Sequence, residues 1–221
     1  MTERSARGGA GPVWVVLVAA GVALYVVLDV VVQLLPPHYS PIVDPESDLG
    51  VGPYGWLMDL NFLVRGLLTA AALIAIRQAT PRSAMRRTGL IFLGLWGLCS
   101  GLLAFFATDV FKFGDPQVHL TGHGTAHLLL AGAGFLCAPV AAILLSRAGV
   151  LGARAKTARP LAVLCVVALV AMVVIGRVGD ALGLAERIFI GAVLLWTLTV
   201  TLTLPRRTAA ALSPHPMEAA R

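Results

Sequence analysis

The sequence has little charge for its length. Only 13% of its 221 residues are charged, whereas apolar residues make up 58% and the mean hydropathy is +0.86. A soluble domain is about one quarter charged and cannot solvate its surface with half of that. Disordered chains combine low hydrophobicity with high net charge, so this composition excludes disorder as well. The sequence therefore predicts an integral membrane protein.

Other shortages exclude particular chemistries. The composition also excludes a disulfide-stapled fold, and the three cysteines form no C-x-x-C pair, which gives no support to redox chemistry or a cysteine–zinc cluster. The two lysines, Lys112 and Lys156, fall between the apolar stretches, so no span supplies the lysine that a retinal Schiff base needs. The sequence contains neither a P-loop nor a dinucleotide fingerprint. A bis-histidine haem is unsupported too, because only one apolar stretch has a histidine clearly inside it.

What the sequence has instead is six apolar stretches of about 20 residues, the length that a helix needs to cross a ~30 Å hydrocarbon core. Pro12 suits the first turn of the first helix, and Pro36 and Pro37 end it. We predict an all-α bundle of six transmembrane helices at residues 13–35, 57–77, 88–108, 123–145, 160–178 and 184–204. This domain, residues 13–205, lies between tails at 1–12 and 206–221, and its last two helices are expected to form a tight hairpin.

Basic residues gather at alternate ends of these stretches. Thirteen of the 17 lysines and arginines lie before the first, between the second and third, between the fourth and fifth, or after the sixth. The positive-inside rule places these ends in the cytoplasm. We therefore expect a multi-pass protein of the cell membrane with both termini inside. The basic residues have no interleaved aromatics and no binding motif, so we expect no nucleic-acid partner.

Acidic residues and histidines gather in the opposite, outer half. At 1.5 Å per residue, Asp29 lies roughly 9 Å below the outer end of its helix, Arg65 roughly 12 Å and His127 roughly 6–12 Å. Ionisable groups at such depths are costly unless they are paired or wetted, so they should face the bundle interior. Two interpretations remain open: an Asp29–Arg65 ion pair that orients the helices, or a polar cavity open to the outside.

Three histidines recur at four-residue spacing. His119, His123 and His127 would share one face of a helix, and two imidazoles at this spacing bind zinc in H-E-x-x-H motifs. Gly124 replaces the glutamate of that motif. One interpretation is therefore a divalent metal, such as zinc, held by His123 and His127 with an acid such as Asp109 or Asp29. The alternatives are hydrogen-bonded anchors at a helix start, or direct contact with a ligand.

These residues give a set of candidate roles. In a catalytic site, we expect His123, His127 and Asp109 to hold a metal and Arg65 to stabilise negative charge. Around them, the side chains expected to contact a ligand are those of Asp29, Asp48, Asp59, His119, Glu186 and Arg187.

Four short motifs resemble the membrane-protein family known as domain of unknown function 998. They are Ser-Asp-Leu-Gly at 47–50, the segment 56–68 from Trp-Leu-Met-Asp to Gly-Leu-Leu, Phe-Ala-Thr-Asp at 106–109, and Gly-Leu-Ala-Glu-Arg at 183–187. The sequence differs from the family in Asp48, where glutamate is usual, and in lacking proline beside Asp109. The resemblance covers about residues 13–205. It implies a six-helix architecture and an outer site, and it names no reaction.

Three functions fit this pattern. The one we favour is a binding or accessory protein of the membrane. A metal-assisted intramembrane hydrolase acting on a lipid or amphiphile is the first alternative, because a bound metal would activate water. A small carrier or exporter is the second, although the cytoplasmic halves of the spans have almost no polar residues. The expected partners are the bilayer and a lipid or small amphiphilic ligand.

Overall fold

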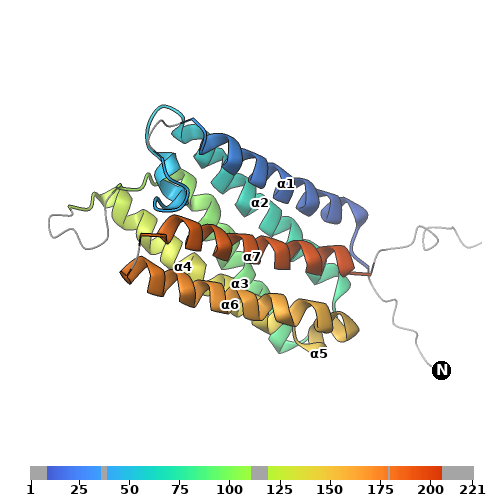
Figure 1. Ribbon diagram of the computed structural model, residues 1–221. Helices are drawn as coiled ribbons and strands as arrows, with labels where there is room; N and C mark the ends of the chain where they lie inside the picture. Colours follow the sequence, from blue (N-terminus) through green and yellow to red (C-terminus); the bar gives the residue numbers. More distant parts are fainter. Residues whose placement is uncertain (1–8, 36–38, 111–118, 179, 206–221) are drawn as a thin grey trace, which may run out of the picture.

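The computed structural model describes residues 9–35, 39–110, 119–178 and 180–205, and every regular element in these ranges is helical (Figure 1). Six helices are long and apolar enough to cross a membrane, which confirms the predicted architecture. They are α1 (Pro12–Val32), α2 (Gly55–Ala79), α3 (Ala84–Leu102), α4 (Gly122–Leu145), α6 (Ala155–Val178) and α7 (Leu182–Thr203). Four short helices complete the order: η1 (Glu46–Gly50), η2 (Leu103–Phe105), α5 (Ala148–Leu151) and η3 (Gly152–Arg154).

The long helices pack against one another in chain order. Each of them contacts the next, and α7 returns to contact both α1 and α2. In the most apolar 18-residue stretches of α2 and α7 more than half of the residues are buried, whereas in those of α1 and α6 only 28% are. The exposed side chains of α1 and α6 are largely valine and leucine, as expected for surfaces that face lipid.

The bundle has two chemically different ends. At one end, the Ala10 amide donates a hydrogen bond to the Pro205 carbonyl (2.8 Å), so the two ends of the described chain lie together there (Figure 1). This end carries most of the described basic residues that flank the helices, and we call it the basic end. The opposite end carries η1 and all described acidic residues, and we call it the acidic end.

Most helix ends differ from the predicted bounds by a few residues, and two differ most. The third helix was expected to reach residue 108, but α3 ends at Leu102 and continues as η2 to Phe105. Phe106 then takes an extended conformation, and its carbonyl bonds to His127 of α4. The fifth predicted span begins at Pro160, where the apolar run starts, whereas α6 begins at Ala155, because helical geometry continues through the polar first turn.

The connection between α1 and α2 folds over the acidic end. We call its residues 39–54 the capping loop. Glu46 and Leu49 of this loop are buried, and Leu49 packs in a small core with Met58 and Phe62 of α2. The loop also supplies backbone carbonyls to the first amides of α7, with hydrogen bonds of 3.3 Å to Gly183 and 3.0 Å to the next residue. These amides have no partners within their own helix, so the loop caps α7.

Candidate functional site

Arg187 of α7 fixes the capping loop in place. Its guanidinium donates to the main-chain carbonyls of Pro41 (3.2 Å) and Asp44 (3.4 Å), and to the hydroxyl of Tyr39. It also lies 3.7 Å from a carboxylate oxygen of Asp29 on α1, in a salt bridge whose side chains are 16% exposed. One cation therefore connects the capping loop, α1 and α7.

A second, deeper set of contacts links five elements, α1, α2, α3, η1 and α7. Arg65 of α2 donates from Nη1 to the Tyr25 hydroxyl (3.2 Å) and from Nε to the Ser100 hydroxyl of α3 (3.2 Å). The Tyr25 hydroxyl donates in turn to the Glu46 carboxylate, and the Glu46 amide donates to Glu186 Oε2 (2.8 Å). Arg65 is 1% exposed and Glu46 2%, so this set is enclosed. We call these five side chains, together with Asp29 and Arg187, the acidic-end cluster.

Aromatic rings surround the Arg65 guanidinium. Its central carbon lies 5.6 Å from the ring centroid of Tyr25, 5.3 Å from that of Phe62 and 5.0 Å from that of Trp96. The faces of aromatic rings attract cations, and the attraction is stronger where water is excluded. This environment explains how a guanidinium with no carboxylate in direct contact is held inside the bundle.

Asn61 lies one helical turn before Arg65 and has no hydrogen-bond partner among the described residues. The residue is 0% exposed, and neither its amide nitrogen nor its amide oxygen is bonded. An unsatisfied buried polar group costs about 1–3 kcal/mol. Asn61 therefore offers both a donor and an acceptor that nothing in the described chain uses.

Two acids of the capping loop, Glu46 and Asp48, have raised pKa values. Burial raises the pKa of Glu46 to about 7, where the negative charges of Asp29 and Glu186 add to the effect and Arg65 opposes it. Burial, with Glu186 and Asp44 nearby, also raises the pKa of Asp48 to about 7. The cluster contains three carboxyl groups and two guanidinium groups. One proton on a carboxyl group would make it neutral, which is the favourable state in a medium of low polarity.

Of the two interpretations left open, an ion pair between Asp29 and Arg65 does not occur among the described residues. Among the described residues, Asp29 makes its salt bridge with Arg187 instead. The side chain that meets Arg65 on α1 is Tyr25, one turn further into the bundle. Asp29 is level with the first turns of α7, because the capping loop brings the start of that helix against α1.

The three histidines have separate surroundings. His127 is buried, donates from Nδ1 to the Phe106 carbonyl (2.7 Å) and meets Phe62 edge-on. His119 and His123 are exposed, and His123 lies against the ring of Phe106. His119 precedes α4 and so does not share its face.

Asp109 is engaged in capping α4. Its carboxylate accepts from the amide of Thr121 (2.7 Å) and from the Thr121 hydroxyl (3.0 Å), while that hydroxyl accepts from the Gly124 amide. Within the described ranges, no group of three His, Cys, Asp or Glu side chains is placed to hold a metal ion. His123, His127 and Asp109 are therefore not brought together as the expected metal-binding set. Of the described histidines, only His127 forms a side-chain hydrogen bond within the described residues, to the Phe106 carbonyl.

The other expected ligand-contact residues divide into two groups. Glu186 and Arg187 belong to the acidic-end cluster, as does Asp29. Asp48 and Asp59 are half-buried at the same end, but the side chain of neither forms a hydrogen bond or salt bridge within the described residues. The structure therefore brings three of the six together.

Sequence reasoning missed Tyr25, Asn61, Ser100 and Glu46 as members of the site. Tyr25 precedes Asp29 by four residues, and Asn61 precedes Arg65 by four, so each shares a helical face with a residue that was selected. A search for polar partners one turn away would have found both. Glu46 gave no such signal, because loop residues have no periodicity that indicates burial.

The comparisons with known proteins give one match. A family described as "Protein of unknown function (DUF998)" matches residues 7–203, which includes all six long helices. No curated protein and no solved structure matches the chain. Because the match covers most of the sequence, the chain belongs to the DUF998 family of proteins of unknown function.

Proposed function

We propose that the protein is a non-enzymatic binding protein of the membrane, and that it recognises a small polar molecule beside Asn61 and Arg65. The observation that carries this proposal is the Asn61 side chain, fully buried with both amide atoms unpartnered. A ligand with one donor and one acceptor would satisfy both atoms, and this gain would contribute to affinity. Arg65, one helical turn from Asn61, adds a positive charge to the proposed binding site.

The orientation that fits this function has the acidic end outside the cell. The basic residues that flank the helices support a cytoplasmic basic end with both termini inside. The capping loop then faces the outer solution and covers the proposed site. Its attachment depends on Arg187 and Glu46, so its release would open a path to Asn61.

The placement of side chains does not favour the two alternative functions. A metal-assisted hydrolase needs a set of ligands, and the described histidines and Asp109 are engaged or separated. A carrier needs a polar path through the half of the bundle that is nearer the basic end. There, the buried threonine hydroxyls, such as Thr197 and Thr201, bond to carbonyls of their own helix.

Cysteine labelling tests access to the site. Asn61→Cys is placed in a background with the three native cysteines replaced by alanine, and sealed vesicles are treated from either side with a membrane-impermeant methanethiosulfonate reagent. We expect labelling of Asn61→Cys from the outer side. Two controls on the same helix, buried Ala72→Cys and lipid-facing Leu67→Cys, should stay unlabelled. If Asn61→Cys is inert from both sides, the site is closed and the proposed function fails.

Native mass spectrometry of the purified protein tests binding itself. We expect the wild type to retain a small molecule of defined mass, and Asn61→Leu to lose it. Thr69→Val is the matched control, because Thr69 is also buried in α2 but already bonds the Arg65 carbonyl (2.7 Å). A wild type that carries only water, with both variants equally stable, would show that Asn61 has no ligand.

A further inference from the structure

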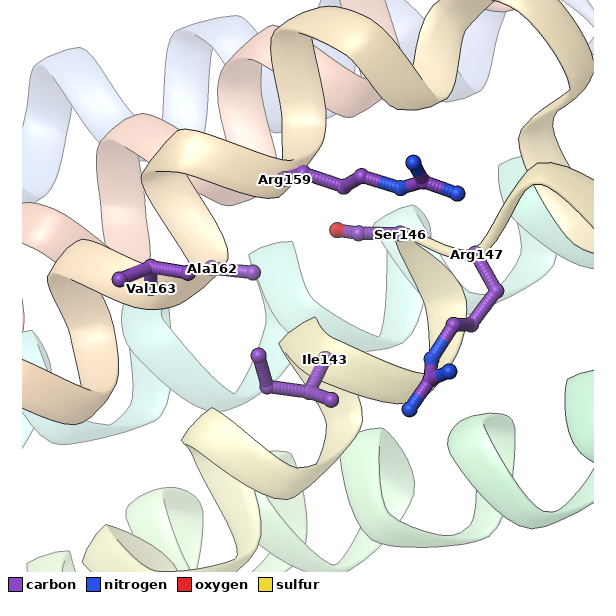
Figure 2. A pocket seen from close by; sticks show the side chains of 6 residues that line it. All are labelled: Ile143, Ser146, Arg147, Arg159, Ala162 and Val163. Carbon is purple, nitrogen blue, oxygen red and sulfur yellow. The ribbon is translucent and has the colours of Figure 1, made fainter.

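A hollow of about 360 Å³ lies at the basic end, far from the acidic-end cluster. It is formed where α4 ends and α6 begins, and it is lined by Ile143, Ser146, Arg147, Arg159, Ala162 and Val163 (Figure 2). Ligand pockets commonly begin at about 300 Å³, so the hollow can accept a compact headgroup. Because it opens between two spanning helices, it lies beside the surrounding lipid.

Two guanidinium groups flank this hollow. In Figure 2, the side chain of Arg159 passes on one side of Ser146 and that of Arg147 on the other. Both arginines are exposed, and neither forms a salt bridge within the described part of the chain. All described carboxylates are at the acidic end, so an anion from outside the described chain is the natural partner of these two cations.

The rest of the lining is partly polar and mainly apolar. The Ser146 hydroxyl accepts a hydrogen bond from Trp196 Nε1 (2.9 Å), which leaves its own hydrogen available for an acceptor. Ile143, Ala162 and Val163 give the hollow an apolar side that continues onto the lipid-facing surface of α6. A ligand that fits this lining has an anionic head and an apolar chain.

We propose that the hollow binds the phosphate of an anionic phospholipid, with an acyl chain lying along the face between α4 and α6. Guanidinium groups bind phosphate oxygens through paired, charge-assisted hydrogen bonds, and basic pockets between spanning helices are suited to such headgroups. A second hollow at this end, of about 340 Å³, is less suitable. Its Arg154 already donates to the Thr203 carbonyl.

The test compares lipid binding by the full chain and two charge-matched variants. Native mass spectrometry in detergent measures the affinity for phosphatidylglycerol and for phosphatidylcholine. Replacing both hollow arginines, in Arg147→Gln/Arg159→Gln, should weaken phosphatidylglycerol binding roughly tenfold or more. Phosphatidylcholine binding should change less than twofold. The control Arg82→Gln/Arg87→Gln removes the same charge from exposed positions at the basic end and should leave both affinities almost unchanged.

Three results would overturn the proposal. Equal losses in the two double variants would mean that the basic end attracts anionic lipid without a specific site. Unchanged binding in Arg147→Gln/Arg159→Gln would place the lipid elsewhere. Displacement of phosphatidylglycerol by millimolar inorganic phosphate would identify a free-anion site instead. All four arginines are exposed, so both variants should fold, and gel filtration with thermal unfolding checks this.

Discussion

Replacement of Glu46 by glutamine should remove a pH dependence of stability that the wild type has. Glu46 is 2% exposed and accepts a hydrogen bond from the Tyr25 hydroxyl. Glutamine keeps an acceptor oxygen for that bond but has no proton to lose. The variant therefore isolates the cost of ionising Glu46 inside the folded chain.

The size of the effect follows from the pKa of Glu46, which burial raises from an ordinary 4.5 to about 7. Each pKa unit corresponds to 1.36 kcal/mol, so this difference contributes about 3 kcal/mol to the free energy of unfolding. The folded chain holds the proton more tightly than the unfolded chain does. Stability from this group is therefore greatest at low pH and decreases as the pH rises from about 4.5 through 7. Between pH 5 and pH 8 the loss should be about 2–3 kcal/mol.

Unfolding of purified protein in detergent, followed by circular dichroism during SDS titration, measures this loss. The difference in unfolding free energy between Glu46→Gln and the wild type should grow in favour of the variant as the pH rises from 5 to 8. Asp48→Asn is a parallel test in the same loop, because burial also raises the pKa of Asp48 to about 7, and the difference between this variant and the wild type should grow with pH in the same sense. If the difference between Glu46→Gln and the wild type is the same at pH 5 and pH 8, the reasoning about burial is refuted.

Three further variants test contacts at the acidic end by thermal unfolding. Gly183→Ala would place a methyl carbon 2.1 Å from a capping-loop carbonyl, so it should lower the free energy of unfolding by several kcal/mol. Its control is Gly191→Ala, which has open space around the added methyl group and should be neutral or slightly stabilising. Asp109→Ala removes the acceptor of the Thr121 amide and should cost about 1–2 kcal/mol; an unchanged melting temperature would count against the cap. His127→Phe loses a 2.7 Å bond to a main-chain carbonyl and should cost about 1–3 kcal/mol. A zinc content that decreased in this last variant would instead restore the metal interpretation.

The positions of the helices could be predicted because they depend on properties that follow directly from the order of residues along the chain. Apolar length defines a span, and the distribution of basic residues separates the two ends of the bundle. The partner of Asp29 could not be predicted in this way. Depth along a helix was estimated, but rotation about its axis was not, so Arg65 seemed to be level with Asp29, and a pair between them was one of the two interpretations.

The capping loop was the part least accessible to sequence reasoning. Its short segments of proline, aspartate and serine indicate a surface connection, yet it buries Glu46 and Leu49 and caps α7. Its fold depends on contacts with Arg187 and Glu186, more than 130 residues later in the chain. No local pattern contains that information.

The salt bridge between Asp29 and Arg187 has a consequence for how the chain is made. Its two residues lie on the first and last spanning helices, so the carboxylate is synthesised long before its partner. At ~5–20 residues per second, the delay is roughly 8 to 30 seconds. During that time α1 has a carboxyl group near the membrane without its cation. A chain that stops before α7 never gains Arg187, so its Asp29 carboxyl keeps the cost of an ionisable group at the membrane without this partner.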